Sequence, residues 1–430
     1  MLTSKDLVLF LAALLLTLSV VIVQRRRGKA NRGGHPATIT PPPANFTSGT
    51  KSDGNKDRRP GDWTPVDFAY PPVTPVAEAL DQIAPRPYRP YKPGRYHVTM
   101  GIRPMDWQSW IEVDRDFPAY YRLRAARLAS PRGPKLYATL PDRPQLVRGG
   151  ADAARELVHE LAEFLIARYP GVYRATRHGG EIVAVEVLPV GVTHDLEAED
   201  PIVVAAMLTQ DDLAIMIEGT DGQYYLQAGA ILLPGSWRLE DKAGLPLDAI
   251  HTSGHVPQYE EKLQPSLTRF FRRLSPSSPV ERNNWVIQVL PPMPAAAPSS
   301  LPSPSPAAPS QLEELAWAEG TYGPEDMHGA GPRPAPVTPL PERMRLRVER
   351  QTLRRLPRSG AIVFTIRVYL TPLAELGPGE AGRLAAAIRG VKEQEVVYRH
   401  RGQSNFEDAA LEWLDGQHRD EVRRGSAHQE

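Results

Sequence analysis

The sequence of 430 residues contains no cysteine. This absence excludes disulfide bonds, thiol catalysis, cysteine-ligated iron–sulfur clusters and haem iron held by a thiolate. It is compatible with any redox compartment. If the chain binds a metal ion or a haem, the ligands must therefore be histidine, tyrosine, methionine or carboxylate side chains.

The chain also lacks an excess of charge of either sign. Its 51 basic and 50 acidic residues leave a formal net charge of +1, and this balance gives no indication of a nucleic-acid partner. Cysteine-based cluster motifs are absent too, so an iron–sulfur centre is not expected here. Electrons, if the chain needs them, must come from another subunit.

Long apolar runs are absent except for one at residues 7–23, where only two of the seventeen residues are polar. Seventeen residues is about the lower limit for a helix that crosses a bilayer. One lysine precedes the run and three arginines follow it. This asymmetry predicts a retained single-pass membrane anchor over residues 1–24, with the main domain facing the cytosol. A cleaved secretory signal is the alternative, although its usual order, basic residues first, is reversed here.

Proline, by contrast, is abundant, with 45 residues concentrated in linkers. Residues 25–65 are polar and rich in proline, glycine and lysine, which predicts a disordered spacer. Residues 291–340 are rich in proline, alanine and serine and cannot pack a core. We interpret them as an insertion between two parts of one domain, residues 66–290 and 341–415. Residues 416–430 form a charged tail.

The remaining segments show clear periodicities. Apolar residues spaced along one helical face predict helices over residues 152–169 and 259–274, and two more helices are expected near residues 379–389 and 405–414. Short β-branched or alternating runs, typical of strands, cover residues 182–187, 201–208, 213–217, 224–233, 285–290 and 361–370. The Asp221-Gly222 dipeptide predicts a hairpin. Several antiparallel strands with few helices between them indicate an α+β fold.

Two histidines stand out because they lie between a strand and an amphipathic helix. His251 and His255 are four residues apart, and Gly254 lies between them, so we expect a bend there and not a continuous helix. The carboxylates close by in sequence are Glu240, Asp241, Glu260 and Glu261. His251 is a candidate ligand of a metal ion or haem, or it only hydrogen-bonds across the turn. Zinc is the weaker hypothesis because a catalytic site needs a third protein ligand.

These motifs together resemble the catalytic (alpha) subunit of the haem-dependent oxidative N-demethylases, a family with a PAS-like core. The matching residues in the central stretch are Pro234, Ser236, Trp237, Asp241, Lys242, Gly244, Ile250, His251, Val256, Pro257, Arg282, Asn284 and Trp285. Residues 96–114, the Asp211-Asp212-Leu213 run and the basic run of residues 347–357 resemble further parts of the family pattern. The resemblance extends over roughly residues 95–372, interrupted by the insertion.

The resemblance implies a PAS-like antiparallel sheet with flanking helices, preceded by the transmembrane helix and the spacer. It also implies a haem cofactor, with His251 at the ligand position and His255 in reserve. The arginines expected to pair with the haem propionates are Arg282, Arg350, Arg354 and Arg355. Guanidinium groups suit this role because they bind carboxylates bidentately. Glu240 and Asp241 are expected to hold a substrate ammonium and take its proton.

The function implied is that of an oxygenase that demethylates a small alkylamine. In the bacterial enzymes of the family, flavin and iron–sulfur components supply the electrons, and folate accepts the one-carbon unit. We therefore expect a partner reductase and, through the resemblance alone, folate. Two alternatives stay open: a non-catalytic haem-binding sensor of the PAS type, and a membrane-tethered interaction module that binds no haem.

Overall fold

The computed structural model describes residues 58–94, 97, 99–235, 237–254, 259–290, 315, 340–399 and 406–427. All of them belong to the unit formed by residues 49–430. Residues 1–48 lie outside the described residues.

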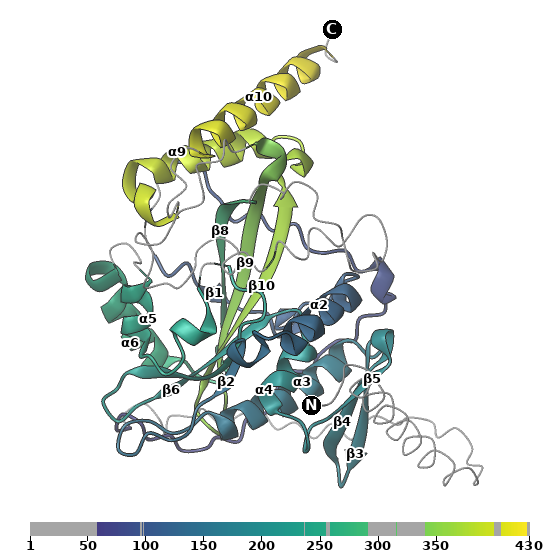
Figure 1. Cartoon of the computed structure of the whole chain (residues 1–430), viewed down its shortest axis with the longest axis vertical. Helices are drawn as coiled ribbons and strands as arrows, with labels where there is room; N and C mark the ends of the chain where they lie inside the picture. Colours follow the sequence, from purple (N-terminus) through teal and green to yellow (C-terminus); the bar gives the residue numbers. More distant parts are fainter. Residues whose placement is uncertain are drawn as a thin grey trace, which may run out of the picture. The chain divides into compact units, whose positions relative to one another are not determined.

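Seven of the described strands form one sheet, in the order β1-β8-β9-β10-β6-β7-β2 (Figure 1). Every pair of neighbouring strands is antiparallel. The strands are β1 Arg103–Pro104, β2 Tyr137–Thr139, β6 Asp212–Glu218, β7 Tyr224–Ala230, β8 Val280–Val289, β9 Met344–Arg355 and β10 Ile362–Pro372. A smaller antiparallel sheet contains β3 Tyr173–His178, β4 Glu181–Val187 and β5 Val192–Asp195. The predicted hairpin at Asp221-Gly222 is confirmed between β6 and β7.

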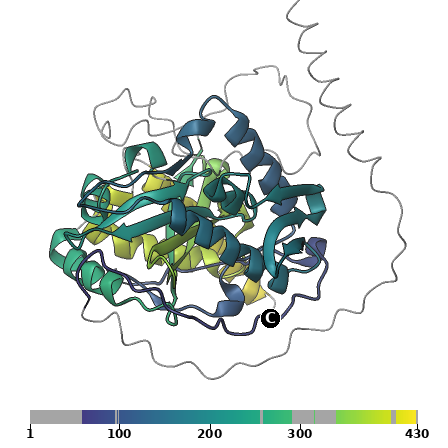
Figure 2. The same ribbon diagram turned by 90° about the horizontal axis from the view of Figure 1, so that it is seen from below.

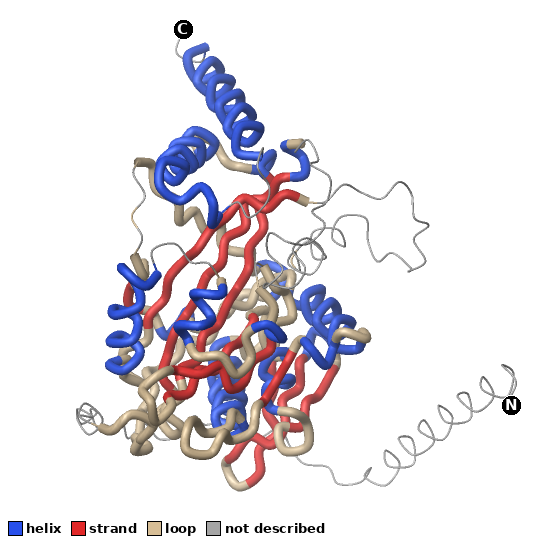
Figure 3. The backbone as a smooth tube through the Cα atoms, turned by 60° about the vertical axis from the view of Figure 1, so that its left-hand side comes forward, coloured by secondary structure: helices blue, strands red, loops and turns tan. Residues whose placement is uncertain are grey.

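Helices lie on both sides of the main sheet, as Figure 3 shows in blue on either side of the red strands. The α-helices are α2 Phe117–Ala129, α3 Ala151–Arg168, α4 Pro201–Met207, α5 Leu247–Ser253, α6 Gln264–Arg273, α9 Glu380–Arg399 and α10 Phe406–Ala427. A π-helical turn, η6 Tyr259–Leu263, leads into α6. The short 3-10 turns are η1 Leu80–Gln82, η2 Trp107–Ser109, η3 Gly133–Lys135, η4 Leu188–Val190, η5 Leu239–Asp241, η8 Pro341–Arg343 and η9 Leu373–Glu375. The expected α+β fold with antiparallel sheets is confirmed.

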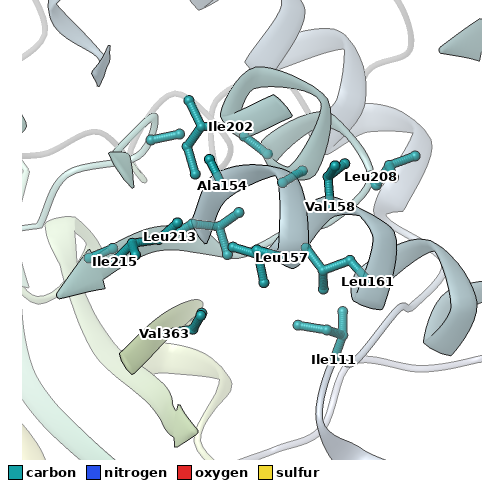
Figure 4. Close-up of a cluster of buried hydrophobic side chains, with 14 of the residues drawn as sticks. Ile111, Ala154, Leu157, Val158, Leu161, Ile202, Leu208, Leu213, Ile215 and Val363 are labelled. Carbon is teal, nitrogen blue, oxygen red and sulfur yellow. The ribbon is translucent and has the colours of Figure 1, made fainter. Parts of the chain in front are cut away.

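One face of the main sheet packs against α3, and we call it the α3 face. Leu157 and Leu161 of α3 are fully buried; in Figure 4, Leu157 lies beside Leu213 of β6, and Leu161 lies beside Ile111. Burying a leucine in this way contributes about 1.5–3 kcal/mol. The apolar spacing that predicted a helix over residues 152–169 therefore marks the stripe that anchors α3 to the sheet.

The opposite face, which we call the α5 face, lies toward α5 and α6 (Figure 1). Arg355 of β9 reaches the end of α6, where it donates to the carbonyl of Leu274 at 2.7 Å. The chain entering α5 is joined to β7 by a bridge between Pro246 and Tyr225. Because side chains alternate along a strand, these contacts decide which residues of β8, β9 and β10 lie on the α5 face.

A second hydrophobic cluster lies at the other end of the long strands, where α9 and α10 pack. It joins Leu346 and Val348 of β9 to Leu384 of α9 and Leu414 of α10. In the view from below, the yellow-green β9 and β10 lie in the middle of the unit (Figure 2). The two helices predicted near the C-terminus are confirmed as α9 and α10.

The strand expected over residues 201–208 is wrong, because this segment is the helix α4. The side chain of Asp200 caps the helix by accepting from the N–H of Ile202 at 3.0 Å, and Pro201 occupies the first turn. Both features favour a helix N-terminus. The apolar, β-branched residues that suggested a strand suit this helix, because most positions of α4 are buried.

The structure also corrects the expected N-terminal part of the fold. No helix in the described ranges is both long and apolar enough to cross a bilayer. The predicted transmembrane helix, and with it the single-pass membrane localisation, is therefore not supported. The apolar run of residues 7–23, on which that prediction rested, lies outside the described residues.

Candidate functional site

His251 lies in the last turn of α5. Pro246, in an extended conformation, precedes the helix, and Asp248 occupies its first turn, where a negative charge is favourable. Gly254 caps the other end, and its N–H donates to the carbonyl of Ile250 at 3.1 Å. The expectation that His251 lies on a turn is therefore wrong, because the histidine belongs to α5, whereas the expected interruption at Gly254 is confirmed, because α5 ends there.

The hydrogen bonding of His251 defines its tautomer. Its Nδ1 lies 2.8 Å from the carbonyl oxygen of Leu247. Because a carbonyl only accepts, Nδ1 carries the proton and Nε2 keeps its lone pair. Burial lowers the pKa of His251 below its ordinary value, although the bond to Leu247 acts in the opposite direction. This neutral imidazole with a fixed Nδ1–H is the form that binds a metal through Nε2.

Tyr259 fixes the plane of the His251 ring. The two rings are stacked, with centroids 4.7 Å apart and planes within 8° of each other. The Tyr259 hydroxyl donates to Asp248 at 2.6 Å, and the Gln264 side chain donates to the other carboxylate oxygen of Asp248 at 2.8 Å. The first turn of α5 thus holds the tyrosine against the histidine in its last turn.

Lys242 holds the C-terminal end of α5. It is buried, and its ammonium group donates to the carbonyl of Ile250 at 2.9 Å and to the hydroxyl of Ser253 at 2.7 Å. A cation at a helix C-terminus is favourable because unpaired carbonyls collect there. The lysine of the Asp241-Lys242 motif therefore positions the helix that carries His251.

Arg282 of β8 is the one predicted arginine that the structure brings close to His251. Its positive charge contributes to the lowered pKa of His251, after the larger effect of burial. The sheet register places Arg282 opposite Gln351 of β9, and Gln351 opposite Ile366 of β10. All three lie on the α5 face, and Phe364 lies next to Ile366 on the same face of β10.

Arg350 and Arg354 point to the α3 face, away from His251. Arg350 is buried and donates to Glu281 at 2.7 Å. Arg354 pairs with Glu160 of α3, and its guanidinium lies 4.2 Å from the ring centroid of Trp110. Both side chains link the sheet to the elements that cover the α3 face.

Arg355 lies on the α5 face but near the end of α6. Its guanidinium donates to Leu274, Gly360 and Phe271 carbonyls and to the hydroxyl of Tyr224. A basic run in the sequence thus alternates between two faces of the sheet. The assignment of Arg350, Arg354 and Arg355 to haem propionates gains no support from these contacts and stays a prediction.

The two predicted catalytic carboxylates form ion pairs elsewhere. Glu240 pairs with Arg132 at 2.6 Å and with Lys135 at 2.9 Å. Asp241 pairs with Arg238 at 3.0 Å. A role in amine binding would require these side chains to exchange their present partners, so it stays a prediction.

His255 lies outside the described residues. Within the part of the chain that the structure describes, no group of three or more His, Asp or Glu side chains is arranged to hold a metal ion. Sequence reasoning missed Glu349, which lies on the α5 face between Arg347 and Gln351. The signal that could have found Glu349 is the alternation of side chains along β9. Because this segment contains so many arginines, it was interpreted only as a basic run.

The fold and the site define a class: an α+β protein with one neutral, oriented histidine beside an antiparallel sheet. A bound haem needs a single imidazole nitrogen, a cation for its propionates and apolar surface. His251 and Arg282 fit the first two needs, and Phe364 and Ile366 are apolar side chains on the same face of the sheet as Arg282.

The family model of the haem-dependent oxidative N-demethylase, alpha subunit-like, matches residues 101–411. The chain therefore belongs to this family. The family is haem-dependent, which supports haem as the cofactor and an activity of the oxidative N-demethylase type.

Proposed function

We propose that the chain is a haem-dependent oxygenase that removes a methyl group from a small alkylamine. The observation that carries this proposal is the hydrogen bond from His251 Nδ1 to the Leu247 carbonyl. It leaves Nε2 as the metal-binding nitrogen in a chain without thiolates. The family match supports the type of reaction, and the substrate is our inference.

Haem, when bound, supplies the oxygen-activating chemistry. His251 would hold the iron, and the Leu247 carbonyl would make its imidazole a better donor by accepting the hydrogen bond from Nδ1–H. Arg282 would hold a propionate through paired hydrogen bonds. Phe364 and Ile366, on the same face of the sheet as Arg282, would supply apolar surface that keeps water from the reacting methyl group.

Electrons would come from a partner reductase. This inference is supported by the absence of cysteine, which excludes a cysteine-ligated iron–sulfur cluster in this chain. Folate as the acceptor of the one-carbon unit is proposed from the family resemblance alone.

The test is the visible spectrum of the full-length chain reconstituted with haem. We expect wild type to bind one haem and His251→Ala to lose the Soret band, because the ligand nitrogen is removed. His178→Ala is the matched control, since His178 is exposed on β3. Circular dichroism on each variant shows whether the fold is kept.

Each outcome separates one hypothesis from the others. Loss of the band in His255→Ala alone would move the ligand to His255. Haem binding without amine-dependent formaldehyde release, in the presence of a chemical reductant and oxygen, would favour the sensor. A wild type that binds no haem would contradict both haem-based functions.

A further inference from the structure

Glu349 is a carboxylate on the α5 face of the sheet. The register of β8 and β9 pairs it with Asn284, two residues along from the pair of Arg282 and Gln351 and so on the same face. On the other side of β9, Glu349 pairs with Val368 of β10. No other acidic side chain of the described strands β8, β9 and β10 lies on this face. Glu349 is therefore the carboxylate of these three strands that lies on the same face as Arg282, the arginine near His251.

The present contacts of Glu349 leave it able to accept more hydrogen bonds. One oxygen accepts from Arg347 Nε at 3.3 Å, and the other accepts from Gln351 Nε2 at 3.0 Å. A carboxylate has about four acceptor positions, so about two are left. Its side chain is 19% exposed, so another molecule can reach it.

Arg347 does not neutralise Glu349 through a close bidentate pair. Its terminal nitrogens are engaged by the Leu315 carbonyl at 2.8 Å and the Leu233 carbonyl at 3.3 Å. The guanidinium is buried and shared among several acceptors, so its side chain is fixed. In this respect Glu349 differs from Glu240, which has two close cationic partners.

We propose that Glu349 binds the ammonium group of the amine substrate. This inference rests on the proposed function. An alkylammonium carries N–H donors and a positive charge, which the remaining acceptor positions of Glu349 match. Its methyl groups need apolar neighbours. Val368 and Ile366 of β10 lie opposite Glu349 and Gln351 of β9 and can supply them. The proposed substrate class is therefore a small amine that still carries at least one N–H when protonated.

The experiment measures binding, independently of turnover. Dimethylammonium chloride is titrated by calorimetry into the haem-loaded, full-length chain, with wild type, Glu349→Gln and Glu349→Asp compared. The glutamine keeps the shape but removes the charge, so we expect binding to weaken by about 10- to 100-fold, as when a hydrogen bond to a charged group is lost. We expect the aspartate to recover part of the affinity. Glu181→Gln is the matched control, because Glu181 is exposed on β4 of the smaller sheet.

The outcomes distinguish this inference from the proposed function. If wild type binds neither dimethylammonium nor other small alkylammonium ions, both fail. If Glu349→Gln binds as tightly as wild type, only the role of Glu349 is overturned.

Wild type alone gives a second test if Glu349→Gln does not fold. The neutral analogue N,N-dimethylformamide has a similar size and no charge, so it should bind at least about tenfold more weakly than dimethylammonium. Equal binding would contradict a carboxylate at the amine position.

Discussion

Asp211 and Asp212 are adjacent acids with opposite surroundings. Asp212 accepts from Arg124 at 2.9 Å and from the backbone N–H groups of Leu232 and Leu233 at 3.0 Å each. Asp211 is fully buried, and neither of its carboxylate oxygens has a hydrogen-bond partner among the described residues. Burial raises the pKa of Asp211 to about 6, although nearby Arg367 acts in the opposite direction.

The raised pKa of Asp211 predicts that this carboxyl group lowers the free energy of unfolding more as the pH rises. The folded state binds the proton more tightly than the unfolded state, so the stabilisation is complete below pH 3.8 and is lost as pH rises to about 6. Relative to wild type, Asp211→Asn should gain on the order of 3 kcal/mol between pH 4 and pH 7, at about 1.4 kcal/mol per pKa unit. Chemical denaturation at a series of pH values measures this difference. Asp212→Asn is the contrasting control and should be destabilised at pH 7.

At the scale of single residues, the sequence indicates which residues are chemically suited to a site. It indicates less well which residues these side chains contact. His251 follows from the motif, but its protonated Nδ1 depends on a helix that places Leu247 one turn before it. Arg350 and Arg354 have partners, Glu281 and Glu160, that are 69 and 194 positions away in sequence. Such partners are fixed by sheet register and helix packing, which local patterns do not contain.

At the scale of elements, the clear periodic helix α3 was predictable, while α4 and α5 were not. Both are only seven residues long, and α4 is buried nearly all round, so neither shows the periodicity of an amphipathic helix. Their end signals were present: Asp200 and Pro201 at the start of α4, and Gly254 after α5. Capping residues were therefore more informative here than apolar spacing.

The segment of residues 58–70 is a further element that composition did not reveal, because its first part was assigned to the spacer. Trp63 donates its indole N–H to the Pro357 carbonyl at 2.9 Å, and Arg355 lies 4.8 Å from its ring centroid. The backbone N–H of Val66 also donates to Pro357, at 3.0 Å. The segment thus packs on the turn between β9 and β10.

Gly360, in that turn, predicts a measurable coupling with Trp63. Its φ is +74°, and a Cβ added there would lie 2.2 Å from the Trp63 ring. Gly360→Ala should cost about 1–2 kcal/mol from backbone strain alone, plus the overlap with the indole. In a Trp63→Ala background the overlap is removed, so the cost of Gly360→Ala should fall by at least about 1 kcal/mol. A double-mutant cycle of unfolding free energies tests this, and additive values would contradict the packing of residues 58–70 on the turn.

At the scale of the whole molecule, the main sheet is built from segments far apart in sequence. β8 and β9 pair over ten positions although residues 290–343 separate them, and the backbone N–H of Leu290 still donates to the Arg343 carbonyl at 2.9 Å. Composition alone indicated an insertion there. The order of strands across the sheet was not predictable, because antiparallel pairing of this kind leaves no local signal.

This pairing predicts that the chain can be divided without losing the fold. Fragments 1–300 and 301–430, when co-expressed, should associate, because the ten positions of β8 and β9 and the five of β6 and β10 are still available. Co-purification and circular dichroism of the complex measure the outcome. Val348→Asp in the second fragment should prevent association, since Val348 is 1% exposed. The prediction would be contradicted if fragment 1–300 alone unfolded at the same temperature as the intact chain, because β9 and β10 would then add nothing to its stability.

The central position of β9 and β10 has a consequence for the order of synthesis. β6, β7 and β8 leave the ribosome before the two strands that pair with them, since β9 begins at Met344. Until then the edges of β6 and β8 present unpaired backbone groups, which can pair with other chains. The nascent chain therefore passes through a long interval in which chaperone protection is needed, and its folding is completed only when residues 344–372 have been made.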